Sequence, residues 1–273
     1  MRLEDALLDS CLCQPDAPLG GDPRRLLVSD KSTAKQQLSD LKPWLNQQQT
    51  LLWANRRDAV LLVLQGPDCC GKDGVIRHVL SACNPQGLAL HSFQAPSPAE
   101  RAEHWLQRYR QRLPAPGLLG VFNRSYYEGL VSDLQDGLCP DAALASRRAE
   151  VATLETQLGQ RRIHLLKCYL QLSRGEQRLR LERRLELPSK RWKLSRADLD
   201  AHRQFDSLQA RWASELAASH SSAAPWYVIP ADHRWQRDLL VASLLARTLE
   251  RLQLDWPAQP APFSLAELQA CAG

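Results

Sequence analysis

The stretch that decides the fold covers residues 66–74 and runs Gly66-Pro67-Asp68-Cys69-Cys70-Gly71-Lys72-Asp73-Gly74. It matches the pattern GxxxxGK, whose two glycines let the backbone wrap tightly so that its N–H groups point inward. The lysine supplies a mobile cation, and a helix that begins there adds the partial positive charge of its N-terminus. The stretch therefore predicts an anion cradle that binds phosphate groups, formed by Gly66, Gly71, Lys72, Asp73 and Gly74.

The sequence on either side favours a phosphate loop over its alternative, an ordinary glycine-lysine turn. Residues 59–64 form an unbroken apolar run, Ala-Val-Leu-Leu-Val-Leu, which is typical of a strand buried on both faces of a parallel sheet. Residues 72–82 are predicted to form a helix. A buried strand that enters the loop and a helix that leaves it are the context that a phosphate loop requires.

Asp73 stands where the pattern usually has a Ser or Thr hydroxyl that binds Mg²⁺. Asp68 and Asp73 are the nearest carboxylates that can replace this hydroxyl, and Asp68 is the candidate metal ligand of the loop. Two alternatives stay open at this point, namely Asp68 as a simple turn residue and Asp73 as a negative charge at a helix N-terminus.

A second polar cluster follows the apolar strand predicted at residues 118–122. Asn123, Arg124 and Glu128 come at or after the carboxyl end of this strand, the edge at which open α/β sheets bind ligands. Arg124 can neutralise phosphate through two parallel hydrogen bonds, whereas Asn123 and Glu128 can bind Mg²⁺ directly or through water. The alternative is a polar loop with a surface arginine.

The remaining chain alternates between strand and helix patterns. Strands are predicted at residues 88–93, 163–172 and 226–229, and helices at residues 31–57, 98–113 and 237–252, with Pro43 kinking or dividing the first helix. This alternation predicts an α/β fold with a parallel sheet flanked by helices. We divide the chain into an irregular, loosely attached N-terminal arm (1–30), one kinase-like domain (31–256) and a C-terminal tail (257–273).

A basic segment, which we call the lid, spans residues 178–196. Pro188 interrupts it, so two short helices around a turn are predicted. In phosphoryl-transfer enzymes, a closing basic lid balances the developing negative charge and excludes water. The alternatives are a solvated helix face and a nucleic-acid patch, although only Trp192 offers a ring for base stacking. The eight basic residues of the lid are Arg178, Arg180, Arg183, Arg184, Lys190, Arg191, Lys193 and Arg196.

The composition narrows the classes of function. The net charge of +5, from 35 Lys and Arg against 30 Asp and Glu, is too mild to indicate a polyanion partner by itself. The eight cysteines contain no CxxC pair, which argues against a zinc site or disulfide framework and favours a reducing cytosol. No apolar signal core begins the sequence, and no apolar run reaches the ~18 residues of a membrane span. We therefore expect a soluble, cytoplasmic protein.

Together, these motifs resemble the polyphosphate kinase 2 family over most of the chain. The resemblance implies a thymidylate-kinase-like P-loop core with a helical basic lid. It also implies dependence on Mg²⁺, with Mn²⁺ as the alternative metal, and a homodimer or homotetramer. The matching segments are residues 64–68 with 71–74, 84–87 (Asn-Pro-Gln-Gly), 95–97 (Ala-Pro-Ser), 122–128 (Phe-Asn-Arg-Ser-Tyr-Tyr-Glu), 190–193 (Lys-Arg-Trp-Lys) and 225–233 (Pro-Trp-Tyr-Val-Ile-Pro-Ala-Asp-His).

The resemblance also implies roles at the matching positions. His233 would lie near the nucleotide base, with a packed loop histidine as the alternative. Three features depart from the family pattern and predict weaker turnover or an altered choice of acceptor: the bulky pair Cys69 and Cys70, Gly129 in place of a common acidic residue, and the polar segment 132–137. The catalytic candidates are Asp68, Lys72, Arg124 and Arg183; the lid adds Lys190, Arg191 and Lys193 as phosphate ligands; and the metal candidates are Asp68 and Glu128.

The predicted reaction is a reversible, Mg²⁺-dependent transfer of a phosphoryl group between inorganic polyphosphate and a nucleoside mono- or diphosphate, such as AMP, ADP or GDP. A nucleotide phosphate oxygen would attack in line, without a protein nucleophile. One alternative is an ATP-dependent nucleotide kinase, and another is a catalytically weakened relative that only binds polyphosphate. Neither a membrane nor a nucleic acid is expected as a partner.

Overall fold

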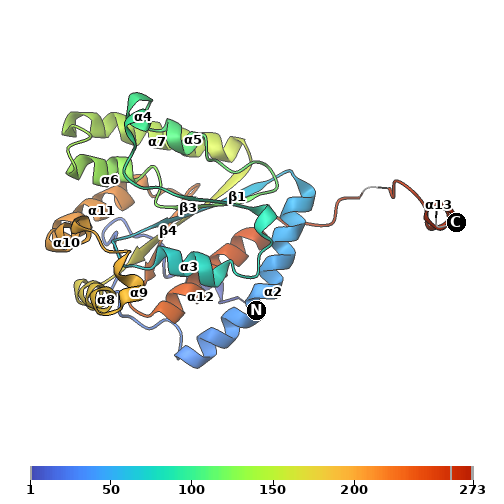
Figure 1. Cartoon of the computed structure of the whole chain (residues 1–273), viewed down its shortest axis with the longest axis horizontal. Coiled ribbons are helices and arrows are strands. Elements are labelled where there is room, and N and C mark those ends of the chain that lie inside the picture. The colour runs from blue at the N-terminus through green and yellow to red at the C-terminus, as the bar shows by residue number, and fades with distance from the viewer. Residues whose placement is uncertain (1, 259, 272–273) are drawn as a thin grey trace.

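The computed structural model describes residues 2–258 and 260–271, so positions 1, 259 and 272–273 of the predicted arm and tail lie outside the described residues. The described chain forms a five-stranded parallel sheet with helices on both faces, which confirms the predicted α/β fold (Figure 1). The strands are β1 (Ala59–Gln65), β2 (Leu88–Ser92), β3 (Leu119–Asn123), β4 (Ile163–Gln171) and β5 (Trp226–Pro230).

Helices connect and flank these strands. The α-helices are α1 (Asp5–Asp9), α2 (Lys31–Asn55), α3 (Lys72–Val79), α4 (Pro98–Ala102), α5 (Gln107–Arg110), α6 (Glu128–Gln135), α7 (Leu144–Gln160), α8 (Arg174–Glu186), α9 (Pro188–Arg191), α10 (Arg196–Arg203), α11 (Phe205–Ser219), α12 (Arg234–Glu250) and α13 (Leu265–Ala270). Two 3₁₀ turns, η1 (Pro85–Gly87) and η2 (Asp141–Ala143), complete the list. No described helix is both long enough and apolar enough to cross a bilayer.

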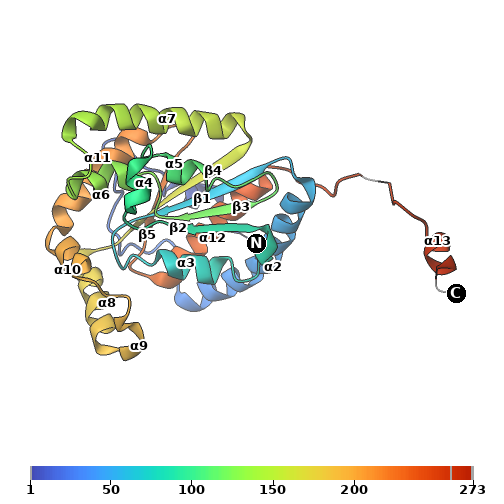
Figure 2. The same ribbon diagram turned by 45° about the horizontal axis from the view of Figure 1, so that its top comes forward.

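The strand order β2-β3-β1-β4-β5 places β1 at the centre of the sheet. Helices α2, α3 and α12 cover one face of the sheet, and α5, α6, α7 and α11 cover the other (Figure 2). Alternate side chains of β1 pack on these two faces, with Val60 and Leu62 on the first and Leu61 and Val63 on the second. The helix after β1 and the helix after β3 therefore lie on opposite faces of the sheet. Such a switch opens a crevice between the carboxyl ends of the two strands, where α/β proteins bind ligands.

The single helix predicted at residues 98–113 is wrong, because the chain forms two short helices, α4 and α5, with a break between them. Ser97 and Glu100 make a capping box that starts α4. The break turns Trp105 toward α6 and α7, where its indole N–H donates to Glu150 at 3.0 Å and the guanidinium of Arg147 lies 4.6 Å from its ring centre. Burial of this side chain outweighs the helical periodicity of the sequence.

Much of the segment before α2 is not the loosely attached arm that its prolines and glycines suggest. Leu8 of α1 is fully buried against the domain. The backbone at Cys11–Cys13 adds a short antiparallel bridge to β5, with Cys13 N donating to Trp226 O at 2.9 Å and Val228 N donating to Cys11 O. Main-chain pairing with a strand at the edge of a sheet needs no periodic apolar pattern, so residues 1–30 carry little sign of it.

Three further boundaries are informative. α2 continues through Pro43 undivided, and the Asp30 carboxylate caps it by accepting from Ser32 N and Thr33 N. α12 begins at Arg234, three residues before the prediction. The lid forms two helices around Pro188, as predicted, and α13 of the tail lies apart from the body of the molecule (Figure 1).

Candidate active site

The phosphate loop lies between β1 and α3, as the sequence predicts. Gly66 and Gly71 have φ angles of +138° and +100°, in the region that residues with a side chain rarely adopt. A Cβ atom at Gly66 would lie 2.5 Å from Leu170 O, and one at Gly71 would lie 1.9 Å from Arg237 Nη1. Both glycines are therefore required by backbone conformation and by space.

Replacement of Gly71 by alanine is expected to lower the free energy of unfolding by about 1–3 kcal/mol, because the strained φ angle and the clash with Arg237 act together. Gly159, near the end of α7, has no atom within 4 Å of its ideal Cβ position. Gly159→Ala is the matched control and should raise stability by roughly 0.5–1 kcal/mol. Urea denaturation measures both values, and equal effects of the two changes would contradict this account.

Lys72 begins α3, and its side chain folds back into the loop. Its Nζ donates to Gly66 O at 2.8 Å and to Pro67 O at 3.3 Å, and the residue is only 8% exposed. Arg237, from α12, supports the loop from behind by donating from Nη1 to Cys70 O at 3.0 Å. The ammonium group of Lys72, which is predicted to bind phosphate oxygens, is thus held inside the turn rather than in bulk solvent.

Asp68 and Arg124 meet at the carboxyl ends of the neighbouring strands β1 and β3. Arg124 Nη2 donates to Asp68 Oδ1 at 2.6 Å, and Arg124 has a left-handed φ of +65° directly after β3. The charge of Glu128 is the largest influence that raises the pKa of the Arg124 guanidinium, and Asp68 adds to it while burial opposes both. Arg124 is therefore a fixed positive charge beside the loop, not an isolated surface arginine.

Asp73 links the loop to β3 and to the lid. Its carboxylate accepts from Asn123 Nδ2 and from Lys193 Nζ, both at 2.9 Å. Burial acts to raise the pKa of Asp73, but the hydrogen bonds from Lys193 and Asn123 lower it overall. Asp73 thus does more than place a negative charge at a helix N-terminus, because it holds a lid cation next to the phosphate loop.

The other predicted lid residues lie further from the loop. Arg183 and Lys190 are exposed, and neither side chain forms a hydrogen bond or ion pair with another described residue. Arg191 Nε donates to Leu185 O within the lid itself. His233 occupies the N-cap position of α12 without a side-chain capping hydrogen bond, and the centre of its ring lies 5.6 Å from that of the Trp235 ring. Their roles toward phosphate or nucleotide stay predictions.

The two candidate metal ligands, Asp68 and Glu128, both lie near Arg124 and raise the pKa of its guanidinium. Glu128 accepts a hydrogen bond from Ser132 Oγ, so its carboxylate has a fixed orientation. In the described residues no cluster of three or more His, Cys, Asp or Glu side chains forms a ready metal cage. Mg²⁺ commonly uses one or two carboxylates and completes its shell with water and substrate phosphates, which this pair of oxygen ligands fits.

The three features that depart from the expected motif pattern, namely Gly129, the segment 132–137 and the cysteine pair, can each be examined through their contacts and burial. A Cβ atom at Gly129 would lie 2.5 Å from the Trp105 ring, so the glycine makes room for that indole and no acidic side chain fits there. Within segment 132–137, Asp133 pairs with Arg147 at 3.0 Å. Burial raises the pKa of the Cys69 thiol to about 11, so little reactive thiolate forms at neutral pH.

Sequence reasoning missed a buried network beneath the second strand end. Glu155 accepts from Tyr126 at 2.9 Å, from Tyr127 at 2.7 Å and from Lys167 Nζ at 3.0 Å. This network fixes the two tyrosines that follow Arg124 and so positions the polar loop after β3. A lysine inside the apolar run of β4 was the available sign, because a buried charge requires a partner.

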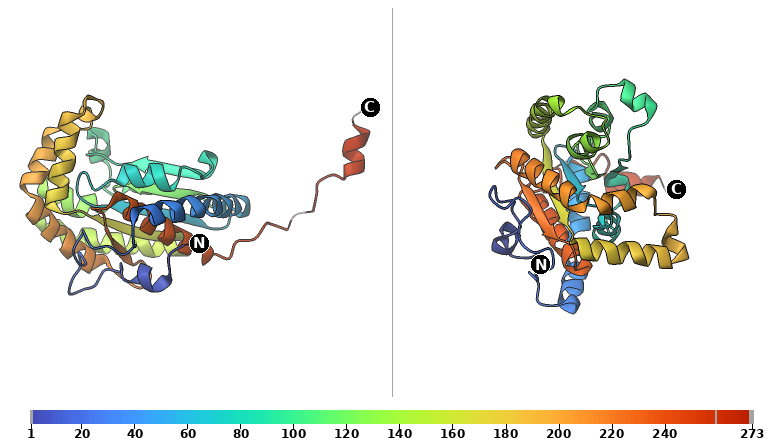
Figure 3. Two further views of the ribbon diagram at one scale, coloured as in Figure 1. Left: turned by 90° about the horizontal axis from the view of Figure 1, so that it is seen from below. Right: turned by 90° about the vertical axis from the view of Figure 1, so that its left-hand side faces the viewer.

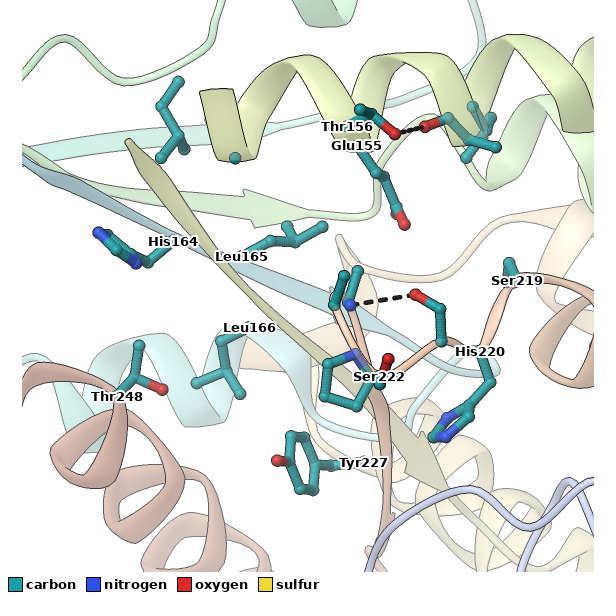
Figure 4. Close-up of a pocket in the computed structure, with 18 of the residues that line it drawn as sticks. Glu155, Thr156, His164, Leu165, Leu166, Ser219, His220, Ser222, Tyr227 and Thr248 are labelled. Atoms are coloured by element: carbon teal, nitrogen blue, oxygen red, sulfur yellow. Dashed lines mark hydrogen bonds between the residues drawn. The ribbon is translucent and has the colours of Figure 1, made fainter. Parts of the chain in front are cut away.

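A separate cavity of about 750 Å³ lies beside the start of β4. It is enclosed by α7, by the segment between α11 and β5, and by the end of α12, and Figure 4 shows Glu155, His164, His220 and Tyr227 around it. The lining includes no residue of the phosphate loop or of 123–128. The start of a parallel strand is the opposite end from the loops that bind ligands, so the candidate active site is the cluster of polar and charged side chains around the phosphate loop.

The parallel sheet and the glycine-lysine loop at its carboxyl edge define a P-loop protein of the α/β class. Within this class, the chain belongs to the polyphosphate kinase 2 family, whose family model, described as "Polyphosphate kinase 2", matches residues 28–255. The family prediction made from the motifs is confirmed.

Individual relatives agree with this assignment. The AMP/ADP-polyphosphate phosphotransferase of Meiothermus ruber is 38% identical over 227 residues, covering 83% of this chain and 85% of that protein. The ADP-polyphosphate phosphotransferase of Rhodopseudomonas palustris is 38% identical over 237 residues, covering 82% and 80%. The crystal structure of polyphosphate kinase 2 from Arthrobacter aurescens matches with a TM-score of 0.89 at 32% identity, covering 97% of this chain and 96% of that one.

Proposed function

We propose that this protein catalyses the reversible transfer of a phosphoryl group between inorganic polyphosphate and a nucleoside mono- or diphosphate. The observation that carries the proposal is the buried Lys72 side chain inside the phosphate loop, next to the Arg124–Asp68 pair at the sheet switch point. Two relatives are named AMP/ADP-polyphosphate phosphotransferase and ADP-polyphosphate phosphotransferase, and these names support the same substrate classes here.

In the proposed mechanism, the inward-facing amides of the loop bind the terminal phosphates of the donor chain. A phosphate oxygen of the nucleotide attacks the terminal phosphorus in line, and the bond to the next bridging oxygen breaks, so the polymer loses one unit. Lys72, Arg124 and lid cations such as Lys193 spread the negative charge that develops. No protein nucleophile is required.

Mg²⁺ is the metal that we propose, with Mn²⁺ as the alternative, and it would neutralise phosphate oxygens when bound. Asp68 and Glu128 are the residues that would hold it, because both place carboxylate oxygens around Arg124. The assignments of Arg183, Lys190 and Arg191 to the polymer are part of the same proposal. A cytoplasmic location and a homodimer or homotetramer stay predictions.

The direct test supplies AMP, ADP or GDP with long-chain polyphosphate as the only phosphoryl donor and follows products by chromatography. We expect the next higher nucleotide to form with Mg²⁺ and formation to stop after chelation by EDTA. A second reaction contains ATP and a nucleoside monophosphate without polymer. Transfer only in that second reaction would identify an ATP-dependent nucleotide kinase, and binding of polymer without any transfer would identify a non-catalytic relative.

A further inference from the structure

We propose that Gln177 and Arg180 are positioning residues that hold the phosphate loop in its anion-binding form. They lie in α8, just before and just inside the lid, and we call residues 177–180 the root of the lid. This inference rests on the proposed function and deepens it. Both residues belong to α8 and lie one turn apart, on the same side of the helix. Both are buried, with exposed fractions of 1% for Gln177 and 6% for Arg180, although each has a polar or charged side chain.

The two side chains bind three successive carbonyl groups of the loop. Gln177 Nε2 donates to Asp68 O at 3.0 Å. Arg180 Nη1 donates to Cys69 O at 2.9 Å and to Cys70 O at 3.3 Å. The root of the lid therefore contacts the backbone of the phosphate loop directly.

These contacts matter because the C=O and N–H of one planar peptide unit point in opposite directions. Donors that hold the carbonyls of Asp68 and Cys70 therefore also fix the directions of the N–H groups of Cys69 and Gly71. The N–H of Cys70, which shares a peptide unit with the Cys69 carbonyl, donates to Pro67 O at 3.1 Å and closes the turn. A loop fixed in this way does not have to be ordered when the anion binds, so more of the interaction energy appears as affinity. Correctly aimed amides also stabilise charge that develops during transfer.

Each positioning side chain is itself held in place. The second branch of Arg180, Nη2, donates to Ala231 O and Asp232 O, both at 2.9 Å, in the loop after β5. Arg180 Nε donates to Glu176 at 2.7 Å. Gln177 Oε1 lies 2.7 Å from His202 Nδ1 of α10, which fixes the amide with its NH₂ group toward Asp68 O. The planar fork of arginine makes all these bonds at once, which a lysine cannot do.

The arrangement divides the lid into two parts. The root as far as Arg180 belongs to the same rigid unit as the phosphate loop. Beyond it, α8 and α9 project from the body of the molecule (Figure 3), and Trp192 is 77% exposed. We therefore expect closure of the lid over a bound polymer to occur beyond Arg180, where Lys193 Nζ already contacts Asp73 at 2.9 Å, and to leave the orientation of the loop unchanged.

The test is a calorimetric titration of the full chain with tripolyphosphate, which needs neither nucleotide nor turnover. We expect Arg180→Lys, which keeps the charge, and Gln177→Leu, which keeps the size, each to weaken tripolyphosphate binding by roughly tenfold or more, because buried carbonyls lose their donors. The matched controls are Arg211→Lys on the exposed side of α11 and Gln157→Leu on the exposed side of α7, which should bind within about twofold of the wild type.

The outcomes separate positioning from general support of the fold. A lower melting temperature in the two variants with unchanged tripolyphosphate affinity would overturn the inference, because the contacts would then serve stability alone. If Arg180→Lys does not fold, Gln177→Leu decides. If the wild-type protein binds tripolyphosphate but transfers no phosphoryl group, the proposed function is refuted. The comparison of tripolyphosphate affinity between the variants and the wild type still tests the positioning role. Wild-type protein that binds no tripolyphosphate would overturn the inference itself.

Discussion

Replacement of Lys72 by alanine is expected to slow phosphoryl transfer by at least about a hundredfold while the protein stays folded. The Nζ atom lies inside the loop, within hydrogen-bond distance of Gly66 O and Pro67 O, at the place where donor phosphate oxygens would bind. Loss of one fixed donor to developing negative charge commonly costs about 3 kcal/mol of transition-state stabilisation, which corresponds to this factor.

Initial rates of nucleotide formation from polyphosphate measure the effect, and circular dichroism with thermal unfolding shows whether the variant is folded. Lys35→Ala is the matched control, because Lys35 is exposed on α2 and far along the chain from the loop. A Lys72→Ala protein with near-normal rates would remove Lys72 from the mechanism, whatever its affinity for polymer.

Replacement of Lys167 by methionine is expected to lower the free energy of unfolding by about 3–5 kcal/mol. Lys167 is fully buried in β4, and its Nζ donates to Glu155, to the Tyr127 hydroxyl at 2.9 Å and to Ser219 O at 2.9 Å. Burial lowers the pKa of Lys167, and the charge of Glu155 opposes this effect. Removal of Lys167 leaves the Glu155 carboxylate buried without its counter-ion, with only the two tyrosine hydroxyls as donors, which is the costly case for an internal ion pair.

Urea denaturation of a double-mutant cycle tests this account. Glu155→Gln removes the stranded charge, so the double variant should be more stable than Lys167→Met alone, by roughly 1 kcal/mol or more. Lys35→Met, a surface change of the same kind, should stay within about 0.5 kcal/mol of the wild type. If the changes in the free energy of unfolding caused by Lys167→Met and Glu155→Gln simply add in the double variant, the two residues do not interact and this account is wrong.

The residues that could be predicted from the sequence are those with strong local patterns. The apolar run of β1, the two glycines and Lys72 each follow a short-range rule, so the loop and the strand before it were predicted closely. Arg124 and Asn123 were also placed correctly, because parallel strands bring their carboxyl ends to one edge of the sheet.

What could not be predicted depends on contacts between distant segments. The break near Trp105 is set by α7, more than 40 residues further along the chain. The partners of Arg180 lie in two loops on either side of it in the sequence. By charge alone, Arg180 belongs with the other lid cations, yet four of its hydrogen bonds go to backbone carbonyls and a fifth to Glu176. Spacing along one helix does not reveal which of its cations is buried.

The short bridge between residues 11–13 and β5 has a consequence for association with other chains. It covers one outer strand of the sheet, whereas β2, the outer strand on the opposite side, has partly exposed residues, with Leu90 51% exposed. An uncovered outer strand is where aggregation through strand addition begins. Under destabilising conditions, intermolecular pairing should therefore start at β2, and loss of the first thirteen residues would open a second starting point at β5.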